Sequence, residues 1–314
     1  MGRPSLEGVD LKLNRAVDRF DALVKAGRKF VSDENSYGLR MEEHPEVKGI
    51  ILRVEKAESP PPKLGLLIGE CVHQYRSALD HLAFQLLIAN TKGRIPARVV
   101  KRSEFPIFNS GPKFRGKRNR KGKLSSGSGR AKIEGIDPRA QAVIEWLQPY
   151  HRRKNPRALS LWQLQELANI DKHRLLHLSR SALQGSPMMG VKARNVAEVR
   201  GGFIPGPFKR NAIVGEFEVV PIDPRYPFEM HMQPELLTDV AFSKASPARS
   251  VRGLSVVLTL YLIGQFIASD VLPPLTEILD LQSSFDPGRL VHTAELSPSE
   301  RETVGGFSED LRIA

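Results

Sequence analysis

The stretch LGLLIGECVHQYRSALDHLAFQLLIAN, Leu64–Asn90, predicts a long helix around which the rest of the chain is organised. Its apolar residues recur at intervals of three and four, the period of an α-helix with one buried face. With about 3.6 residues per turn, that face holds Val72, Leu79, Leu82, Ala83 and Leu86. The other side carries a polar stripe made of His73, Arg76, Ser77 and Asp80, with His81 at its edge. An exposed Arg76–Asp80 pair would stabilise a helix by only about 0.2–0.5 kcal/mol, so a solvated ion pair does not explain the stripe.

The remaining segments predict further helices and an inserted sheet. Helical spacing is found at 9–32, 138–147, 157–183 and from Ser250 onward, with a break at Pro273. Short alternating segments predict antiparallel strands instead: a hairpin at 36–58 and three to five strands within 185–245. We therefore expect an α+β protein, mainly a helical bundle of four to five helices, whose inserted antiparallel sheet also takes in the early hairpin.

The predicted helical core spans residues 1–110 and 133–284, including both β segments. Within it, FPIF at 105–108 is expected to be an extended segment that docks on the core. Residues 111–132 contain too little apolar surface to offset the entropy of ordering, and they are predicted to form a basic, disordered loop. The polar tail at 285–314 is predicted to be flexible.

Positive charge is concentrated in that loop. The net charge of the chain is +12, and the segment GPKFRGKRNRKGKLSSGSGRAK at 111–132 holds nine lysines and arginines and no acid, which leaves +3 for the remainder. Such a local field favours contact with the phosphates of RNA or another nucleic acid. The residues expected to make it are Lys113, Arg115, Lys117, Arg118, Arg120, Lys121 and Lys123. The alternative is a solvated loop without a partner.

Asp171 lies on the apolar face of the predicted helix at 157–183. The positions around it on that face are all apolar: Leu164, Leu167, Ala168, Leu175 and Leu178. A buried carboxylate without a partner costs several kcal/mol, roughly, so Asp171 should meet a cation or several donors. We expect its partner in the polar stripe, with Arg76 and His81 as the natural candidates.

Arg76 and His81, which are separated by four intervening residues on a helix of an expected bundle, resemble the Arg-x4-6-His element of the HEPN superfamily. This resemblance implies a metal-independent endoribonuclease that acts as a homodimer, with His81 as general acid/base and Arg76 as phosphate ligand. Asp80 or Ser77 would assist, and Asp171 would orient the pair. Two features depart from the family pattern: Ser77 follows the arginine, and the element lies on the second helix. The combination of LDHL, FPIF, LQPY and DKHR also resembles a group of bacterial proteins of unassigned function, which implies a shared fold and no activity.

A second hypothesis is a non-catalytic nucleic-acid-binding or interaction protein, in which the stripe and Asp171 form a structural polar network. The position of Arg76 and His81 discriminates between the two. Side chains that are sealed in the core with satisfied donors indicate structure. Side chains that line a cleft or a two-fold interface near the basic loop indicate catalysis.

Several other classes are excluded or set aside. In DKHRLLH no glutamate follows His173, which argues against an HExxH zinc hydrolase. A cross-helix metal site made of His73, Asp80 and His177 stays a minor alternative, and we expect no metal or cofactor. The apolar run Gly253–Ser269 is shorter than the ~20 residues of a membrane-spanning helix, so it is expected to be a buried core helix. The single cysteine, Cys71, is expected to be a core residue, and with no signal peptide predicted we expect a cytoplasmic protein.

Overall fold

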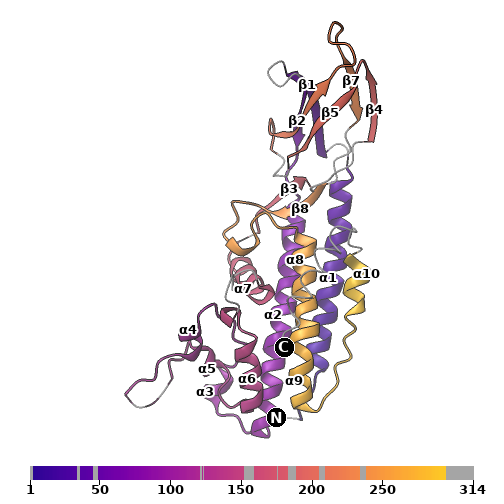
Figure 1. Ribbon diagram of the computed structural model, residues 1–314. Coiled ribbons are helices and arrows are strands. Elements are labelled where there is room, and N and C mark those ends of the chain that lie inside the picture. The colour runs from indigo at the N-terminus through magenta and orange to yellow at the C-terminus, as the bar shows by residue number, and fades with distance from the viewer. Residues whose placement is uncertain are drawn as a thin grey trace.

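The structure is a computed structural model that describes residues 3–33, 36–44, 49–120, 122, 124–151, 159–174, 176–182, 189–204, 209–233 and 238–294. Figure 1 shows an elongated molecule in which long helices lie side by side, with a β region at one end of them. Several short helices gather beside the bundle at the other end. The prediction of a mixed α and β fold with antiparallel strands is confirmed.

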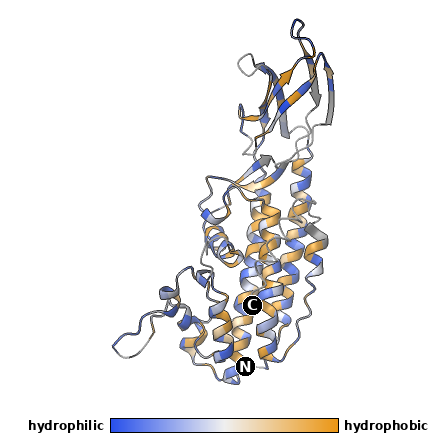
Figure 2. Ribbon diagram, in the orientation of Figure 1, coloured by the Kyte–Doolittle hydropathy of each residue, from blue (hydrophilic) through white to orange (hydrophobic). Residues whose placement is uncertain are grey.

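Two long helices, α1 (Glu7–Val31) and α2 (Pro62–Thr91), pack against each other at the centre of the bundle. The helices α8 (Val256–Phe266), α9 (Leu272–Leu279) and α10 (Gly288–Ala294) lie beside them. The predicted apolar face of α2 is confirmed, since each of its five residues is at most 1% exposed: Val72, Leu79, Leu82, Ala83 and Leu86. Figure 2 shows how apolar residues are concentrated along these helices.

The predicted break at the two prolines takes the form of a change in helix type. A π-helical segment, Ile267–Val271, connects α8 to α9, and Pro273 and Pro274 fall in the first turn of α9. Proline has no backbone N–H to donate, and its ring clashes with the carbonyl four residues earlier. The first turn of a helix tolerates both defects, so α9 restarts there.

Among the described residues, the β region contains eight strands in three antiparallel groups. The larger sheet has the order β1-β2-β6-β5, with β1 (Tyr37–His44), β2 (Gly49–Ala57), β5 (Glu198–Phe203) and β6 (Ile213–Val220). The two-stranded groups pair β3 (Leu178–Ala182) with β8 (Thr238–Phe242), and β4 (Met189–Arg194) with β7 (Glu229–Gln233). The early hairpin joins the later strands through β2 and β6, as predicted.

This region has a hydrophobic core of its own, separate from that of the bundle. Alternate residues of β2 and β6 supply most of it: Ile50, Leu52 and Val54 on β2, and Phe217 and Val219 on β6. The alternation follows from the pleat of a strand, which sends successive side chains to opposite faces. The molecule is therefore built from two apolar clusters joined by a short junction.

Arg180 on β3 lies at that junction and is only 1% exposed. Its Nη2 donates to the carbonyl oxygen of Phe30 at 2.7 Å and to the hydroxyl of Ser36. Its guanidinium carbon lies 4.5 Å from the ring centre of Phe30 and 4.8 Å from that of Tyr37. Phe30 lies in the last turn of α1, and Tyr37 begins β1. The side chain of Arg180 therefore connects the bundle to the sheet.

Three predicted boundaries are corrected. The helix expected at 157–183 is shorter: α7 spans Ser160–Asp171, and β3 begins at Leu178. The backbone of β3 pairs with β8 rather than continuing a helix. The tail is not flexible throughout, because α10 packs on α1 and Leu290 is fully buried. Residues 295–314 lie outside the described part of the chain.

The basic segment at 111–132 is also more ordered than predicted. It begins with α4 (Gly111–Arg115) and ends with α5 (Gly129–Lys132). Phe114 anchors it with no exposed surface, and its ring lies 6.0 Å from that of Phe108 and 5.9 Å from that of Tyr150. One buried aromatic ring thus orders a segment whose average composition predicts disorder. The chain between the two helices protrudes from the molecule (Figure 1).

One helical stretch among the described residues, Val256–Leu279, is long and apolar enough to cross a membrane by length and composition. It is longer than the run read from the sequence, because the π-helical segment carries the helix past the polar residues at 269 and 270. Half of its most apolar window is buried inside the fold. The core helix of a soluble protein can have the same length and apolar composition.

Candidate functional site

Arg76 on α2 is a largely buried clamp on the FPIF segment. Its side chain is 14% exposed, and its Nη2 donates to Asp80 Oδ1 at 2.9 Å and to the carbonyl oxygen of Phe105 at 2.6 Å. Glu104 Oε1 lies 3.9 Å from the same nitrogen. These bonds hold an extended backbone against α2, and the expected docking of 105–108 is confirmed by the complete burial of Phe105.

Asp80 completes the clamp from the same helix. Its Oδ1 accepts the backbone N–H of Phe105 at 2.9 Å in addition to the Arg76 bond. Burial raises the pKa of Asp80, and Arg76 opposes that rise by favouring the carboxylate. Both polar backbone groups of Phe105 are therefore satisfied by one ion pair, which is a structural use of these residues.

His81 faces a different neighbour. Its side chain is exposed and lies beside the first turn of α1, where a Cβ atom on Gly8 would be 2.9 Å from His81 Nδ1. Five positions along a helix correspond to a rotation of about 140°. Arg76 and His81 consequently point toward different elements of the same chain, and one molecule does not gather them around a common substrate position.

Asp171 is placed differently from the prediction. It is half-buried at the last position of α7, because the helix ends there and the apolar face expected beyond it is absent. The carboxylate packs on α2 where Gly69 leaves room, since a Cβ atom on Gly69 would lie 2.0 Å from Oδ1. Burial raises the pKa of Asp171, and His73 lowers it. Its ionisable neighbour in the stripe is thus His73 rather than Arg76 or His81.

The cross-helix metal site considered for His73, Asp80 and His177 is not assembled. In the described ranges no group of three or more His, Cys, Asp or Glu side chains could hold a metal ion. Cys71 is fully buried, and burial raises the pKa of its thiol to about 12. A thiol with that pKa is a core group rather than a nucleophile.

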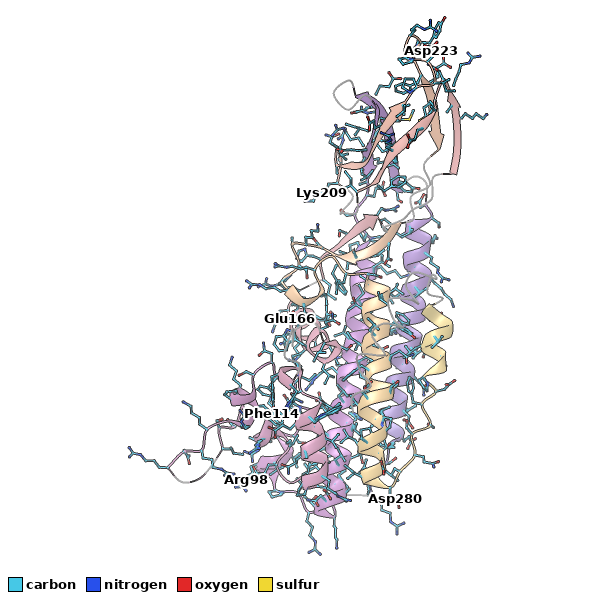
Figure 3. The ribbon with its side chains drawn as sticks, in the orientation of Figure 1. Arg98, Phe114, Glu166, Lys209, Asp223 and Asp280 are labelled. Carbon is cyan, nitrogen blue, oxygen red and sulfur yellow. The ribbon has the colours of Figure 1, made fainter. Side chains whose placement is uncertain are left out.

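The basic segment forms one wall of a cavity of about 870 Å³. The opposite walls come from the chain after α2, including α3 (Ala97–Val100), and from α6 (Pro138–Trp146). Four guanidinium groups and two carboxylates line it: Arg98, Arg102, Arg118, Arg130, Glu134 and Glu145. We refer to it as the arginine cavity. Figure 3 labels Arg98 at this end of the molecule, far from Asp223 in the β region.

The two carboxylates hold the arginines in place. Glu134 pairs with Arg102 and, at 3.5 Å, with Arg98. Glu145 lies 3.3 Å from Arg130 and 3.8 Å from Arg115, just outside the cavity. Each carboxylate therefore faces two guanidinium groups, which leaves an excess of positive charge.

Arg118 adds to that excess from the protruding chain. Its Nη1 donates to the carbonyl oxygen of Gly122 at 2.7 Å, which closes a tight loop, and Leu124 bridges back to Arg118. Gly116 starts the loop with a φ of +69°, a conformation that favours glycine. A side chain at Gly116 would also collide with Ser128, the residue that caps α5. The loop is thus held at both ends.

The predicted nucleic-acid contacts divide into three groups. Arg118 lines the arginine cavity and Arg115 lies beside it, while Lys113, Lys117 and Arg120 are exposed on its outer surface. Lys121 and Lys123 lie outside the described residues.

The residues predicted from the sequence to contact nucleic acid did not include three of the cavity's arginines, Arg98, Arg102 and Arg130, or either glutamate. The segment RIPARVVKR at 94–102 carries its own excess of positive charge, and that signal could have found Arg98 and Arg102.

Comparisons with known proteins add no further constraint. No family model, curated protein or solved structure matches this chain. The class that the structure itself defines is an α+β protein with an elongated helical bundle, a separate β region and an arginine-lined cavity.

Proposed function

We propose that this protein binds nucleic acid, with RNA as the expected partner, through the arginine cavity and the exposed cations of the basic segment. One observation carries the proposal: four arginines from separate parts of the sequence line one cavity together with only two carboxylates. Guanidinium groups match phosphate oxygens with paired, charge-assisted hydrogen bonds. Exposed Lys113, Lys117 and Arg120 extend the positive surface along a bound strand.

The proposal assigns no cleavage chemistry to this site. Arg76 is engaged with Asp80 and Phe105, and exposed His81 lies beside α1, so a single chain does not bring the two side chains to one substrate position. The HEPN-like arrangement of the bundle, its homodimer and its ribonuclease activity remain predictions from the resemblance. A cytoplasmic location remains an expectation as well.

Binding is tested by fluorescence anisotropy with a labelled single-stranded RNA in excess EDTA, over about 50–200 mM salt. The test variant is Arg98→Ala combined with Arg118→Ala. We expect weaker binding and a shallower dependence of log affinity on log salt, by about 0.7 for each lost phosphate contact on a single strand.

The matched control is Arg225→Ala. Arg225 is an exposed arginine that is likewise paired with a carboxylate, Asp223, but in the β region. This control should leave binding unchanged. Absence of binding by the wild-type protein, or an equal loss in the control, would overturn the proposal.

A further inference from the structure

The lining of the arginine cavity has two chemical parts. The charged part is the set of four arginines described above. The uncharged part contains apolar side chains, Leu124, Ile133, Pro138 and Ala142, together with the polar side chains of Asn119, Ser126 and Gln141. A surface that held only the phosphate backbone would need no apolar lining and no side-chain amides.

We infer that the arginine cavity takes up one unstacked nucleotide unit, with its base against the apolar part and its phosphate at the arginines. This inference rests on the proposed function and makes it more specific: it predicts selection of single-stranded over paired RNA. Proteins that read unpaired RNA stack splayed bases on aromatic rings or on guanidinium planes and bond to the base edges.

The residues that line the cavity can supply each of those contacts. Leu124, which is half-buried, and Pro138, which is exposed, provide apolar surface. Gln141 is held in position by its own bond, in which Nε2 donates to the carbonyl oxygen of Ile136 at 2.7 Å. Arg102 is 23% exposed and is braced by Glu134, so its planar group is already ordered before a ligand arrives. A preorganised lining reduces the entropy lost on binding.

The size and shape of the cavity exclude a duplex. A volume of about 870 Å³ is in the range of pockets that enclose a small molecule, and it lies between α6, the chain around α3 and the protruding loop. In paired RNA the bases are stacked and hidden inside the helix, so a duplex meets only the rim of the cavity with its phosphates. Binding of an unstacked nucleotide adds base contacts that the duplex cannot make.

The decisive variant is Ala142→Leu. Ala142 is exposed on α6 and lines the cavity, and leucine is a good helix former, so this change fills space without altering charge or helix stability. Ala193→Leu makes the same substitution at an exposed position of β4, in the β region. Thermal unfolding of both variants should match that of the wild type.

The probes are a labelled single-stranded RNA, a fully paired RNA of the same length, and ATP as a free nucleotide. We expect the wild type to bind the single strand about tenfold more tightly than the duplex, which corresponds to one base contact. Ala142→Leu should remove this preference, while Ala193→Leu retains it.

The outcomes separate the inference from the proposed function. Equal binding of single-stranded and paired RNA, or an unaffected preference in Ala142→Leu, would overturn the nucleotide pocket and leave phosphate binding standing. Binding of ATP alone, abolished by Ala142→Leu, would overturn the RNA proposal and identify the cavity as a site for free nucleotides. Binding of none of the three probes would overturn both.

Discussion

Arg76 and Asp80 lie one turn apart on α2, and both bind the same residue across from them: Arg76 donates to the carbonyl oxygen of Phe105, and Asp80 accepts its N–H. The ion pair between them, at 2.9 Å, fixes both side chains for this purpose. Arg76, one of the two residues of the Arg-x4-6-His resemblance, therefore acts with Asp80 as a clamp that holds an extended segment on the bundle.

Arg76→Ala should destabilise the fold. It removes the bond to the carbonyl oxygen of Phe105 and leaves Asp80 without its cation in a largely buried place. Hydrogen bonds to charged groups contribute about 1.5–3 kcal/mol, and we expect a loss of that size in the free energy of unfolding by urea. Arg139→Ala, an exposed pair with Asp137, is the control and should change stability far less. Equal effects would contradict the clamp.

Asp171→Asn should stabilise the protein at neutral pH. Burial raises the pKa of Asp171 in the folded state above its ordinary value of 3.8, so the folded protein binds this proton more tightly than the unfolded chain does. The stability contributed by protonation is present below that ordinary value and is lost as the pH rises through the folded pKa. Asparagine carries no charge, so Asp171→Asn avoids this loss of folding stability at about pH 7.

The same reasoning gives the pH dependence of the effect. The difference in urea midpoint between Asp171→Asn and the wild type should shrink as the pH falls toward 3.8. A variant that is less stable than the wild type at neutral pH would show that the carboxylate makes a stabilising contact with His73 that outweighs its burial.

Arg180→Met should weaken the junction between the bundle and the β region. The variant keeps an apolar side chain of similar reach but loses the bond to Phe30 and the stacking on two rings. Desolvated cation–π contacts and charged hydrogen bonds are each worth about 2 kcal/mol, so we expect a loss of about 3 kcal/mol or more in urea unfolding.

Two further variants sharpen the Arg180 test. Arg180→Lys should not restore stability, because an ammonium group lacks the planar surface that stacks on Phe30 and Tyr37. Arg200→Met, on the exposed surface of β5, should have little effect. Full stability in Arg180→Lys would indicate that charge alone holds the junction.

Glu134→Gln and Glu145→Gln should strengthen RNA binding. Each glutamate pairs with two arginines at or beside the arginine cavity and offsets one positive charge. Glutamine keeps the shape of the side chain while it removes that competing charge. Each change should make the salt dependence of binding steeper by about 0.7, the value for one additional phosphate contact on a single strand. Glu198→Gln, which frees Arg200 on β5, is the control and should bind as the wild type does. Weaker binding in either cavity variant would show that the carboxylates position the arginines more than they mask them.

The wild-type protein should leave end-labelled single-stranded RNA intact in excess EDTA. Arg76 is bonded to Asp80 and to Phe105, whereas exposed His81 lies beside the first turn of α1, so a single chain does not bring the two side chains to one substrate position. Gel analysis alongside His81→Ala and Arg76→Ala checks this expectation. Cleavage by the wild type that disappears in both variants would restore the catalytic assignment and require a second chain to complete the site.

Much of the fold could be predicted because it depends on short-range patterns. A short stretch of sequence is enough to show the period of 3.6 in α1 and α2 and the alternation in β2 and β6. The same holds for the two prolines in the first turn of α9. The C-terminal half of the helix predicted at 157–183 failed for a long-range reason. Its residues after Leu178 pair with β8, about 60 positions later, and that pairing outweighs the local helical spacing.

The candidate site could be predicted only in part. The excess charge of the basic segment was evident, but its order was not, because one buried ring, Phe114, outweighs the polar composition around it. The direction of each ionisable group on α2 was also undetermined, since a helical wheel places residues on a face without naming the element that covers it.

The sequence by itself determined local features: a helix with a polar stripe, a β-hairpin with strand-like alternation, and a concentration of positive charge at 111–132. Periodicity and composition are local properties, and they survive without any knowledge of the partners. Only the tertiary structure decided that Arg98, Arg102, Arg118 and Arg130 line one cavity. It also decided that Arg76 contacts Phe105 whereas His81 lies beside α1. These outcomes depend on which apolar faces pack together, because burial brings distant segments into contact and carries their charged side chains with them.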